Sequence, residues 1–198
     1  MVFDLVKDKE INETYKLMAQ TIIPRPIAWV VTQNKDGLIN IAPFSYFIGL
    51  SSEPATVLIS VGHKQDNTPK DTLANIRESK RCVICMVDEP NLQKMHFSSK
   101  NLDKDISEAE LFNIDTKSIF DDFPPIIDGV PCAYFCTLNQ EINLGGKTIP
   151  LILNVEQIYV KDENITDKQR LTIDFSPIAR IGKSYARLGE EITPPTIP

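Results

Sequence analysis

The stretch SVGHKQDNTPKDTLANI, residues 60–76, holds the residue types best suited to binding an anion. An apolar run, ATVLISVG, ends at Gly62, and a polar, basic loop follows it before a helix is expected to begin. Free backbone N–H groups and the helix dipole favour negative charge at a helix N-terminus. Lys70 and Thr72 would add a cation and a hydroxyl there, with His63 and Lys64 nearby. The spacing therefore allows a phosphate site.

The same stretch also has an explanation that needs no ligand. Thr68 is a good N-cap residue, Pro69 suits the first helical position, and Asp71 stands where the acid of a capping box belongs. These three residues would account for a helix start and a solvated loop. The carboxylate of Asp71 also argues against a phosphate unless it points back to the cap. From spacing alone, both readings stay open.

A second cluster, NIAPFSYF, lies where a strand is expected to end. Asn40 and Ser45 have side chains that hydrogen-bond the edge of a planar heterocycle, and Phe44 or Trp29 can cover its face. The alternative is a strand with ordinary core aromatics. Arg25 lies between two prolines that hold its backbone extended, so it suits either a phosphate or carbonyl contact or a structural salt bridge.

Other signatures of catalysis are missing from the sequence. There is no GxGxxG fingerprint, no GxxxxGK[ST] loop and no GxSxG elbow. The two histidines, His63 and His96, are too few for a histidine-rich metal site, and His96 is expected on a helix face rather than as a catalytic base. No catalytic side chain and no metal site is predicted. If the protein is an enzyme, a cofactor is expected to carry the difficult step.

The four cysteines are predicted to be buried, reduced and structural. Cys82 and Cys85 are three apart on an expected strand, so their side chains point to opposite faces. Cys132 and Cys136 could share a face, but no second pair completes a metal site.

Composition and charge narrow the class of protein. The chain has 198 residues, of which 42% are hydrophobic and 24% charged, as expected of one globular domain. Its net charge of -6 argues against a general nucleic-acid binder. No segment approaches the roughly 20 apolar residues of a membrane helix, and the first ten residues have no signal-peptide core. The sequence therefore predicts a cytoplasmic protein without nucleic-acid or membrane partners.

The expected elements are mainly strands. A helical arm is predicted over residues 1–20 and a surface excursion, as a lid, dimer arm or spacer, over 101–128. Helices are expected near 68–79 and 89–100. Two strands around the turn Asn-Lys-Asp-Gly are expected in the range 24–47. Further strands are expected over 54–62, 79–87, 131–144 and 148–160 and in the tail after 178. Such mostly antiparallel strands with few helices favour a closed or nearly closed barrel over a wound α/β fold.

Several of these stretches, in this order, resemble one family. RPIAWVVT, NIAPFSYF, SSEPATVLISVG, KDTLANI and the tail GKSYARLGE are similar to the flavin reductase-like, FMN-binding split-barrel family, which includes the flavoredoxins. The resemblance implies a single domain over residues 1–198, mainly β with a few helices, folded as a split β-barrel. It also implies a homodimer with FMN near the interface, reduced by NADH or NADPH before electrons pass to an acceptor.

The resemblance further implies which residues hold FMN. Lys70 and Thr72 would stand at the phosphate, and Tyr185 would cover the site from the tail. The full set of implied cofactor-binding residues is Arg25, Trp29, Thr32, Asn40, Pro43, Phe44, Ser45, Ser60, Lys70, Thr72 and Tyr185. Two alternatives remain: an FMN-binding electron carrier without its own NAD(P)H activity, and a barrel that has lost the cofactor.

Overall fold

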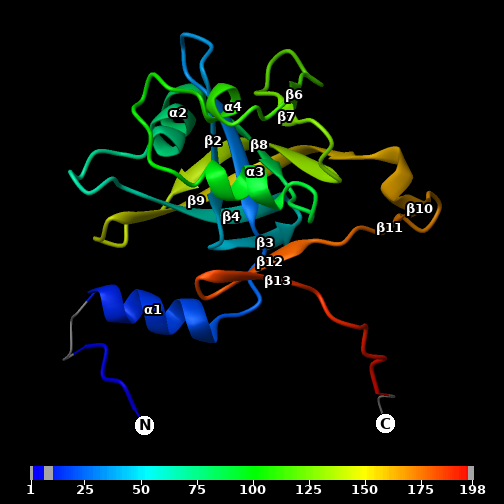
Figure 1. Cartoon of the computed structure of the whole chain (residues 1–198), viewed down its shortest axis with the longest axis horizontal. Coiled ribbons are helices and arrows are strands. Elements are labelled where there is room, and N and C mark those ends of the chain that lie inside the picture. The colour runs from blue at the N-terminus through cyan, green and yellow to red at the C-terminus, as the bar shows by residue number, and fades with distance from the viewer. Residues whose placement is uncertain (1, 7–10, 196–198) are drawn as a thin grey trace.

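The computed structural model describes residues 2–6 and 11–195 and is built around one antiparallel sheet. Its seven strands lie in the order β2-β1-β5-β8-β9-β4-β3, and each neighbouring pair is antiparallel (Figure 1). The strands are β1 (Ala28–Gln33), β2 (Ile39–Phe44), β3 (Phe47–Ser52), β4 (Ala55–Gly62), β5 (Arg81–Cys85), β8 (Cys132–Glu141) and β9 (Thr148–Val160). The expected mainly β, antiparallel fold is confirmed.

The sheet does not close into a barrel. Strands β2 and β3 stand at opposite ends of the strand order, although only Ser45 and Tyr46 separate them in the chain. The chain leaves the sheet after Phe44 and rejoins it at Phe47, where it pairs with β4 instead of turning back onto β2. The sequence predicted a closed or nearly closed barrel. The structure differs from that prediction because β2 and β3 do not pair with each other.

Both faces of the central strands are buried. Trp29 and Val31 of β1 belong to one hydrophobic cluster, whereas Ala28 and Val30 belong to the other. This alternation follows from the two-residue period of a strand. Cys85 and Cys82 divide between the clusters in the same way, as predicted, and all four cysteines are buried and free.

Helix α2 (Asp71–Ser79) begins later than the sequence suggests. Lys70 occupies the N-cap position without a side-chain cap. Thr68 instead donates its hydroxyl to Asp66, at 2.6 Å between oxygens, and Asp71 pairs with Lys64 at 2.9 Å. The predicted cap at Thr68 and capping box at Asp71 are therefore wrong, because both side chains have other partners. The buried Leu73 and Ile76 anchor the helix to the sheet.

The predicted N-terminal helix corresponds to α1 (Ile11–Thr21), which lies apart from the sheet at the lower left of Figure 1. Residues 1 and 7–10 of the predicted arm lie outside the described residues. The expected helix near 89–100 is α3 (Leu92–Phe97). No helix in the described part of the chain is long and apolar enough to cross a membrane.

The polar stretch 101–128 does more than run over the surface. It contains α4 (Glu108–Leu111), β6 (Thr116–Lys117) and β7 (Ile126–Ile127). Ile114, Ile126 and Ile127 are buried in the same cluster as Trp29. Their apolar side chains cover one face of the sheet, so this stretch completes the core.

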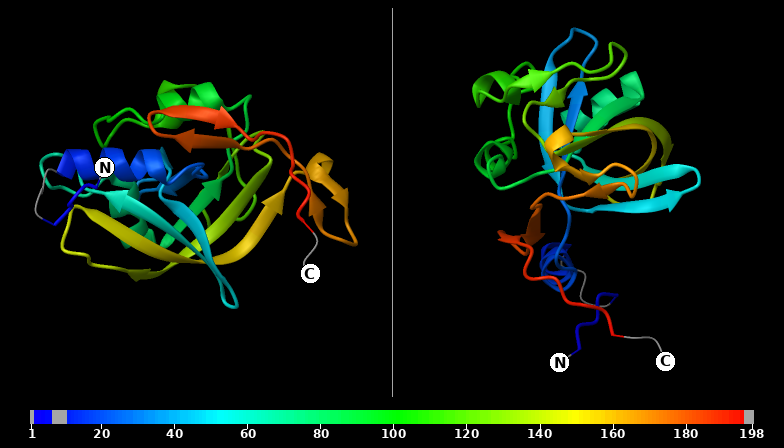
Figure 2. Two further views of the ribbon diagram at one scale, coloured as in Figure 1. Left: turned by 90° about the horizontal axis from the view of Figure 1, so that it is seen from below. Right: turned by 90° about the vertical axis from the view of Figure 1, so that its right-hand side faces the viewer.

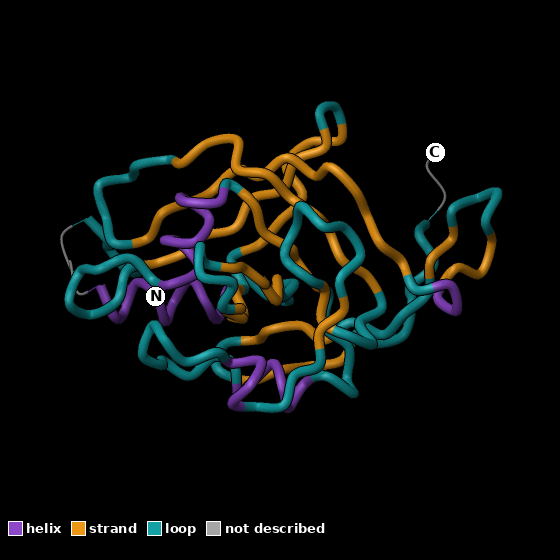
Figure 3. Tube along the Cα trace, turned by 90° about the horizontal axis from the view of Figure 1, so that it is seen from above, coloured by secondary structure: helices purple, strands orange, loops and turns teal. Residues whose placement is uncertain are grey.

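The C-terminal part forms two small hairpins. The first, β10 (Ile165–Asp167) and β11 (Thr172–Ile173) after the turn η1 (Asp162–Asn164), stands out from the body and was not expected from the sequence (Figure 3). The second, β12 (Ile178–Ile181) and β13 (Ser184–Arg187), lies beside α3 in both views of Figure 2. A backbone bond from Ile178 to Val87 and the side-chain pair of Arg187 with Glu89 join it to the chain after β5.

Candidate functional site

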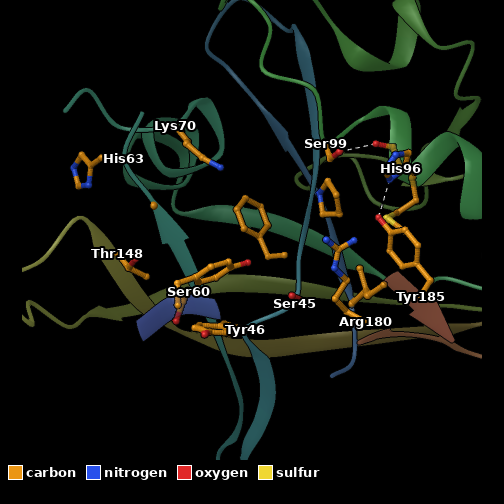
Figure 4. A pocket seen from close by; sticks show the side chains of 16 residues that line it. Ser45, Tyr46, Ser60, His63, Lys70, His96, Ser99, Thr148, Arg180 and Tyr185 are labelled. Atoms are coloured by element: carbon orange, nitrogen blue, oxygen red, sulfur yellow. Dashed lines mark hydrogen bonds between the residues drawn. The ribbon is translucent and has the colours of Figure 1, made fainter. Parts of the chain in front are cut away.

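A cavity of about 390 Å³ lies where the sheet is split, between the helices and the tail hairpin. His63 and Lys70 line one side, and Arg180 and Tyr185 face them from the other (Figure 4). Phe44, Ser45, Tyr46 and Ser60 come from β2, the link to β3, and β4. The site is therefore assembled from segments that span most of the sequence.

The lining of the cavity is cationic. Its charged side chains are Lys70 and Arg180, two histidines also line it, and no Asp or Glu of the described residues does so. This lining contrasts with the net charge of -6 on the whole protein. A cationic hollow in an acidic protein favours an anionic ligand.

Lys70 provides the cation that the sequence suggested. Its Nζ lies 5.9 Å from the centroid of the Phe44 ring. Burial, followed by the charge of Lys64, lowers the pKa of Lys70. The described residues give Lys70 no carboxylate partner, because Lys64 pairs with Asp71. The predicted conflict between Asp71 and a phosphate is thereby reduced, since its carboxylate already has a counter-ion.

A smaller hollow of about 170 Å³ continues from the cavity past Lys70. Pro43 and Lys70 line both spaces, and Asn40, Thr72 and Lys100 line only the smaller one. The Nδ2 group of Asn40 donates to the Thr72 hydroxyl at 3.0 Å, which leaves the Thr72 proton available to another acceptor. This hollow has the residue types that a phosphate needs.

Eight of the sequence-predicted residues line these two spaces, and three do not. Pro43, Phe44, Ser45, Ser60, Lys70 and Tyr185 line the cavity, and Asn40 and Thr72 line the smaller hollow. Arg25, Trp29 and Thr32 line neither of them.

The three exceptions have other partners. Trp29 is fully buried and donates its indole N–H to Ser98 at 2.9 Å. Thr32 is also fully buried and accepts hydrogen bonds from Asn40 and Asn75. Trp29 is thus a core residue, and Thr32 supports Asn40 from below. Neither is placed to contact a ligand in the cavity.

Arg25 has a structural role. Its guanidinium donates to the carbonyl oxygens of Ala19 and of Ile22, the latter at 2.7 Å, at the C-terminal end of α1. Its Nε lies 3.4 Å from the Ser45 hydroxyl. Cationic side chains stabilise the last carbonyls of a helix. Arg25 therefore holds α1 beside the site rather than lining the cavity.

The structure adds residues that the sequence did not single out for the site. His96 was expected on a helix face, and it does lie on α3, but it also lines the cavity and shares a 2.9 Å hydrogen bond with Tyr185. Arg180 stacks on the Tyr185 ring, 4.7 Å from its centroid. The only sequence signal was the Gly182-Lys183 turn, which brings Arg180 and Tyr185 into register.

Tyr46 supplies a polar atom without a partner. Its hydroxyl is buried and has no hydrogen bond within the described residues, although Tyr46 lines the cavity. Burial, followed by the neighbouring Tyr15, raises the pKa of this hydroxyl, and the charge of Arg25 opposes that effect. A buried polar group without a partner is costly, so this hydroxyl fits a ligand with a polar edge.

Comparisons with known proteins agree with this geometry. The family model described as "Flavin reductase like domain" matches residues 18–177. The structure is similar to 2-nitrobenzoate 2-nitroreductase NbaA of Pseudomonas fluorescens, with 29% identity, TM-score 0.88, and coverage of 100% of this chain and 96% of that one.

It is also similar to nitrilotriacetate monooxygenase component B of Bacillus cereus, with 29% identity, TM-score 0.87 and coverage of 98% of both chains. A split barrel domain protein of Shewanella frigidimarina, at 19% identity, TM-score 0.78 and full coverage of both chains, shares the fold. The fold is therefore that of the split-barrel proteins, with an open sheet.

Proposed function

Because this chain belongs to the flavin reductase-like family, we propose that its cavity binds FMN and that the protein is an oxidoreductase using NADH or NADPH. One observation carries the proposal: the unpaired Lys70 stands between a cavity with aromatic and hydroxyl walls and a smaller hollow lined by Thr72 and Lys100. FMN has the matching parts, a planar ring and a phosphate. Since NADH and NADPH are cytoplasmic metabolites, we also place the protein there.

The residues present fit FMN. Lys70 and the hydroxyl of Thr72 would hold the phosphate, with the N–H groups at the start of α2 nearby. Phe44 would contact the ring, and Ser45, Ser60 and the unpartnered hydroxyl of Tyr46 would bond its polar edge. Asp71 and Glu108 also line the smaller hollow, and the pairing of Asp71 with Lys64 reduces its repulsion of the phosphate.

Bound FMN would supply two-electron redox chemistry, with hydride coming from the nicotinamide nucleotide. The protein's own work is placement. Phe44, Ser45 and Ser60 would hold the ring against the split of the sheet, and Arg180 and Tyr185 would face it from the opposite side of the cavity, where the second reactant would bind. Holding two reactants together lowers the barrier through proximity, and no residue of the cavity needs to act as acid or base.

Two candidate functions differ in the molecule that accepts the electrons from FMN. One acceptor is a small organic molecule bound in the cavity, and the similar protein NbaA is named a 2-nitrobenzoate 2-nitroreductase. The other candidate is an electron carrier with the same FMN contacts and no NAD(P)H activity. We favour the first, because Arg180 gives the tail side of the cavity a cation that the proposed FMN contacts do not use.

We also propose that the protein forms a homodimer. Strand β3 is an edge of the sheet, and its Ile48 and Leu50 are 60% and 50% exposed. Met18 and Ile22 of α1 and the following turn are exposed as well. Exposed apolar groups of this kind suit a partner surface, and a second copy would cover them near the split that forms the cavity. Sedimentation analysis measures the mass of the protein in solution and so distinguishes a dimer from a monomer.

An absorbance spectrum of the purified protein tests the main proposal. We expect flavin bands that bleach when NADH or NADPH is added without oxygen. Bands that persist with both nucleotides would support the carrier. A colourless protein that takes up no FMN on addition would overturn the cofactor assignment.

A further inference from the structure

We propose that Arg180 forms a second anion subsite in this cavity, which holds an oxyanion of the second substrate. This inference rests on the proposed function, in which FMN is the first ligand of the cavity and the substrate is the second. It concerns the side of the cavity opposite Lys70, formed by Arg180, Tyr185 and His96 (Figure 4).

Contacts with Arg25 and within the tail hairpin orient Arg180. Its backbone N–H donates to the Arg25 carbonyl at 2.9 Å and its carbonyl accepts from the Arg25 N–H at 3.1 Å. Its guanidinium stacks over the Tyr185 ring, 4.7 Å from the centroid, and Nε donates to the Gly182 carbonyl at 3.1 Å. Stacking and a single Nε bond orient the guanidinium without occupying its outer nitrogens.

Those outer nitrogens are available to a ligand. Neither Nη1 nor Nη2 has a hydrogen bond or an ion pair with any residue that the structure describes. Two other arginines differ, because Arg77 donates from Nε and Nη2 to Glu141, and Arg187 does the same to Glu89. Arg180 is half-buried and lines the cavity, so its free edge meets the interior of the site.

The separation of the two cations of the cavity favours a second anion. Lys70 and Arg180 are the fixed cations of the cavity, and they come from opposite sides of it. One phosphate bound at Lys70 leaves Arg180 without a counter-ion. Neither cation meets an Asp or Glu in the lining of the cavity formed by described residues.

The shape of the group favours a planar partner. With Nε bonded to the Gly182 carbonyl, the guanidinium of Arg180 still offers the N–H groups of Nη1 and Nη2 in one plane, which match a carboxylate bidentately. Tyr185, with its hydroxyl held by His96, would lie beside the ring that carries this carboxylate. An aromatic carboxylate is therefore the favoured substrate class. A phosphate of the nicotinamide nucleotide has the same oxyanion chemistry and is the other source.

Calorimetric titration with benzoate tests the subsite on the FMN-loaded protein, with benzamide as the neutral analogue. We expect benzoate to bind more tightly than benzamide. Arg180→Gln should weaken benzoate binding by about tenfold or more, as loss of a charged hydrogen-bond partner predicts, and Arg180→Lys should weaken it less. Arg170→Gln, on the exposed turn before β11, is the matched control and should change nothing.

A second arm distinguishes the source of the oxyanion. Weak benzoate binding, together with a tenfold loss of NADH or NADPH affinity in Arg180→Gln, would assign the subsite to the nucleotide phosphate. Benzoate and nucleotide affinities that both stay within twofold of the parent would overturn the proposal. Equal thermal unfolding of parent and variant checks the fold, and Arg180→Lys replaces Arg180→Gln if the latter does not fold.

Failure of the proposed function would be visible separately. A protein that binds no FMN contradicts that function, and the benzoate titration of the flavin-free protein then decides the role of Arg180 by itself.

Discussion

The Lys70 side and the Arg180 side of the cavity differ in how the chain supports them. Beneath Lys70, helix α2 packs the fully buried Leu73 and Ile76 onto the sheet. Arg180 belongs to a hairpin of two four-residue strands, which backbone bonds to Ala19, Arg25 and Val87 and the exposed Arg187–Glu89 pair join to the rest. It buries Ile178 and Ala179, fewer side chains than α2 buries. Regions with few buried contacts open more easily. A side supported by more buried side chains suits a cofactor that stays bound. A side supported by fewer suits a substrate that enters and leaves.

The largest expected effect tests the difference in packing. Leu73→Ala removes a fully buried side chain under Lys70 and should lower the free energy of unfolding by about 2–5 kcal/mol. Leu188→Ala, just after the tail hairpin, removes a side chain that is 57% exposed and should change it by less than about 0.5 kcal/mol. Urea denaturation measures both, and equal losses would contradict the comparison.

Next in size is the effect of the Lys70 charge on the cofactor. Lys70→Ala should weaken FMN binding about tenfold or more, because a hydrogen bond to a charged group contributes roughly 1.5–3 kcal/mol. Lys168→Ala, on an exposed turn, is the control. Fluorescence titration with FMN gives both affinities. An unchanged affinity in Lys70→Ala would show that the phosphate lies elsewhere.

A pH effect is expected on the Lys70 side. Glu108 lines the smaller hollow and accepts the Ile41 N–H at 2.9 Å. Burial raises the pKa of Glu108, and that hydrogen bond opposes the rise. The folded state therefore binds its proton more tightly than the unfolded state does, so this group's contribution to stability falls as pH rises from the unfolded pKa through the folded one.

Glu108→Gln keeps an oxygen for Ile41 and removes the charge. The free energy of unfolding, measured from pH 4 to pH 8, should decline less with rising pH in this variant than in the parent. Parallel curves for the two proteins would show that Glu108 does not titrate differently in the folded state.

The smallest effect concerns the tail side. Tyr185→Phe removes the hydroxyl that bonds His96 and keeps the ring under Arg180. A single neutral hydrogen bond contributes roughly 0.5–1.5 kcal/mol, so benzoate affinity should fall less than in Arg180→Gln, at most about tenfold. Titration calorimetry compares the two variants. A larger loss in Tyr185→Phe would make Tyr185, rather than Arg180, the main contact.

Much of the sheet was readable from the sequence because strand signals are local. The Asn-Lys-Asp-Gly turn between two apolar stretches predicted β1 and β2, and the apolar run to Gly62 predicted β4. Strand β3 was missed because Phe47–Ser52 contains Gly49 and two serines and is mostly exposed. The open sheet was not predictable either, since pairing across the split depends on distant strands.

The site was predicted best where its residues are neighbours in the chain. Phe44, Ser45 and Lys70 line the cavity as anticipated, although their contact with FMN stays a prediction. Trp29 is fully buried in a core cluster and does not line the cavity, so its contact with FMN stays a prediction that this geometry does not support. The pairing of His96 with Tyr185 spans 89 residues, beyond any local pattern.

The pairing of Lys64 with Asp71 also bears on how long the protein survives in a cell. It leaves Lys70 near a second ammonium group whose charge, after burial, contributes to lowering the pKa of Lys70. A bound phosphate would relieve this repulsion, and each tenfold excess of ligand over its dissociation constant adds about 1.4 kcal/mol to the folded state. When flavin is scarce, the empty protein would be unfolded more often and degraded sooner. Its abundance would then follow the supply of its cofactor.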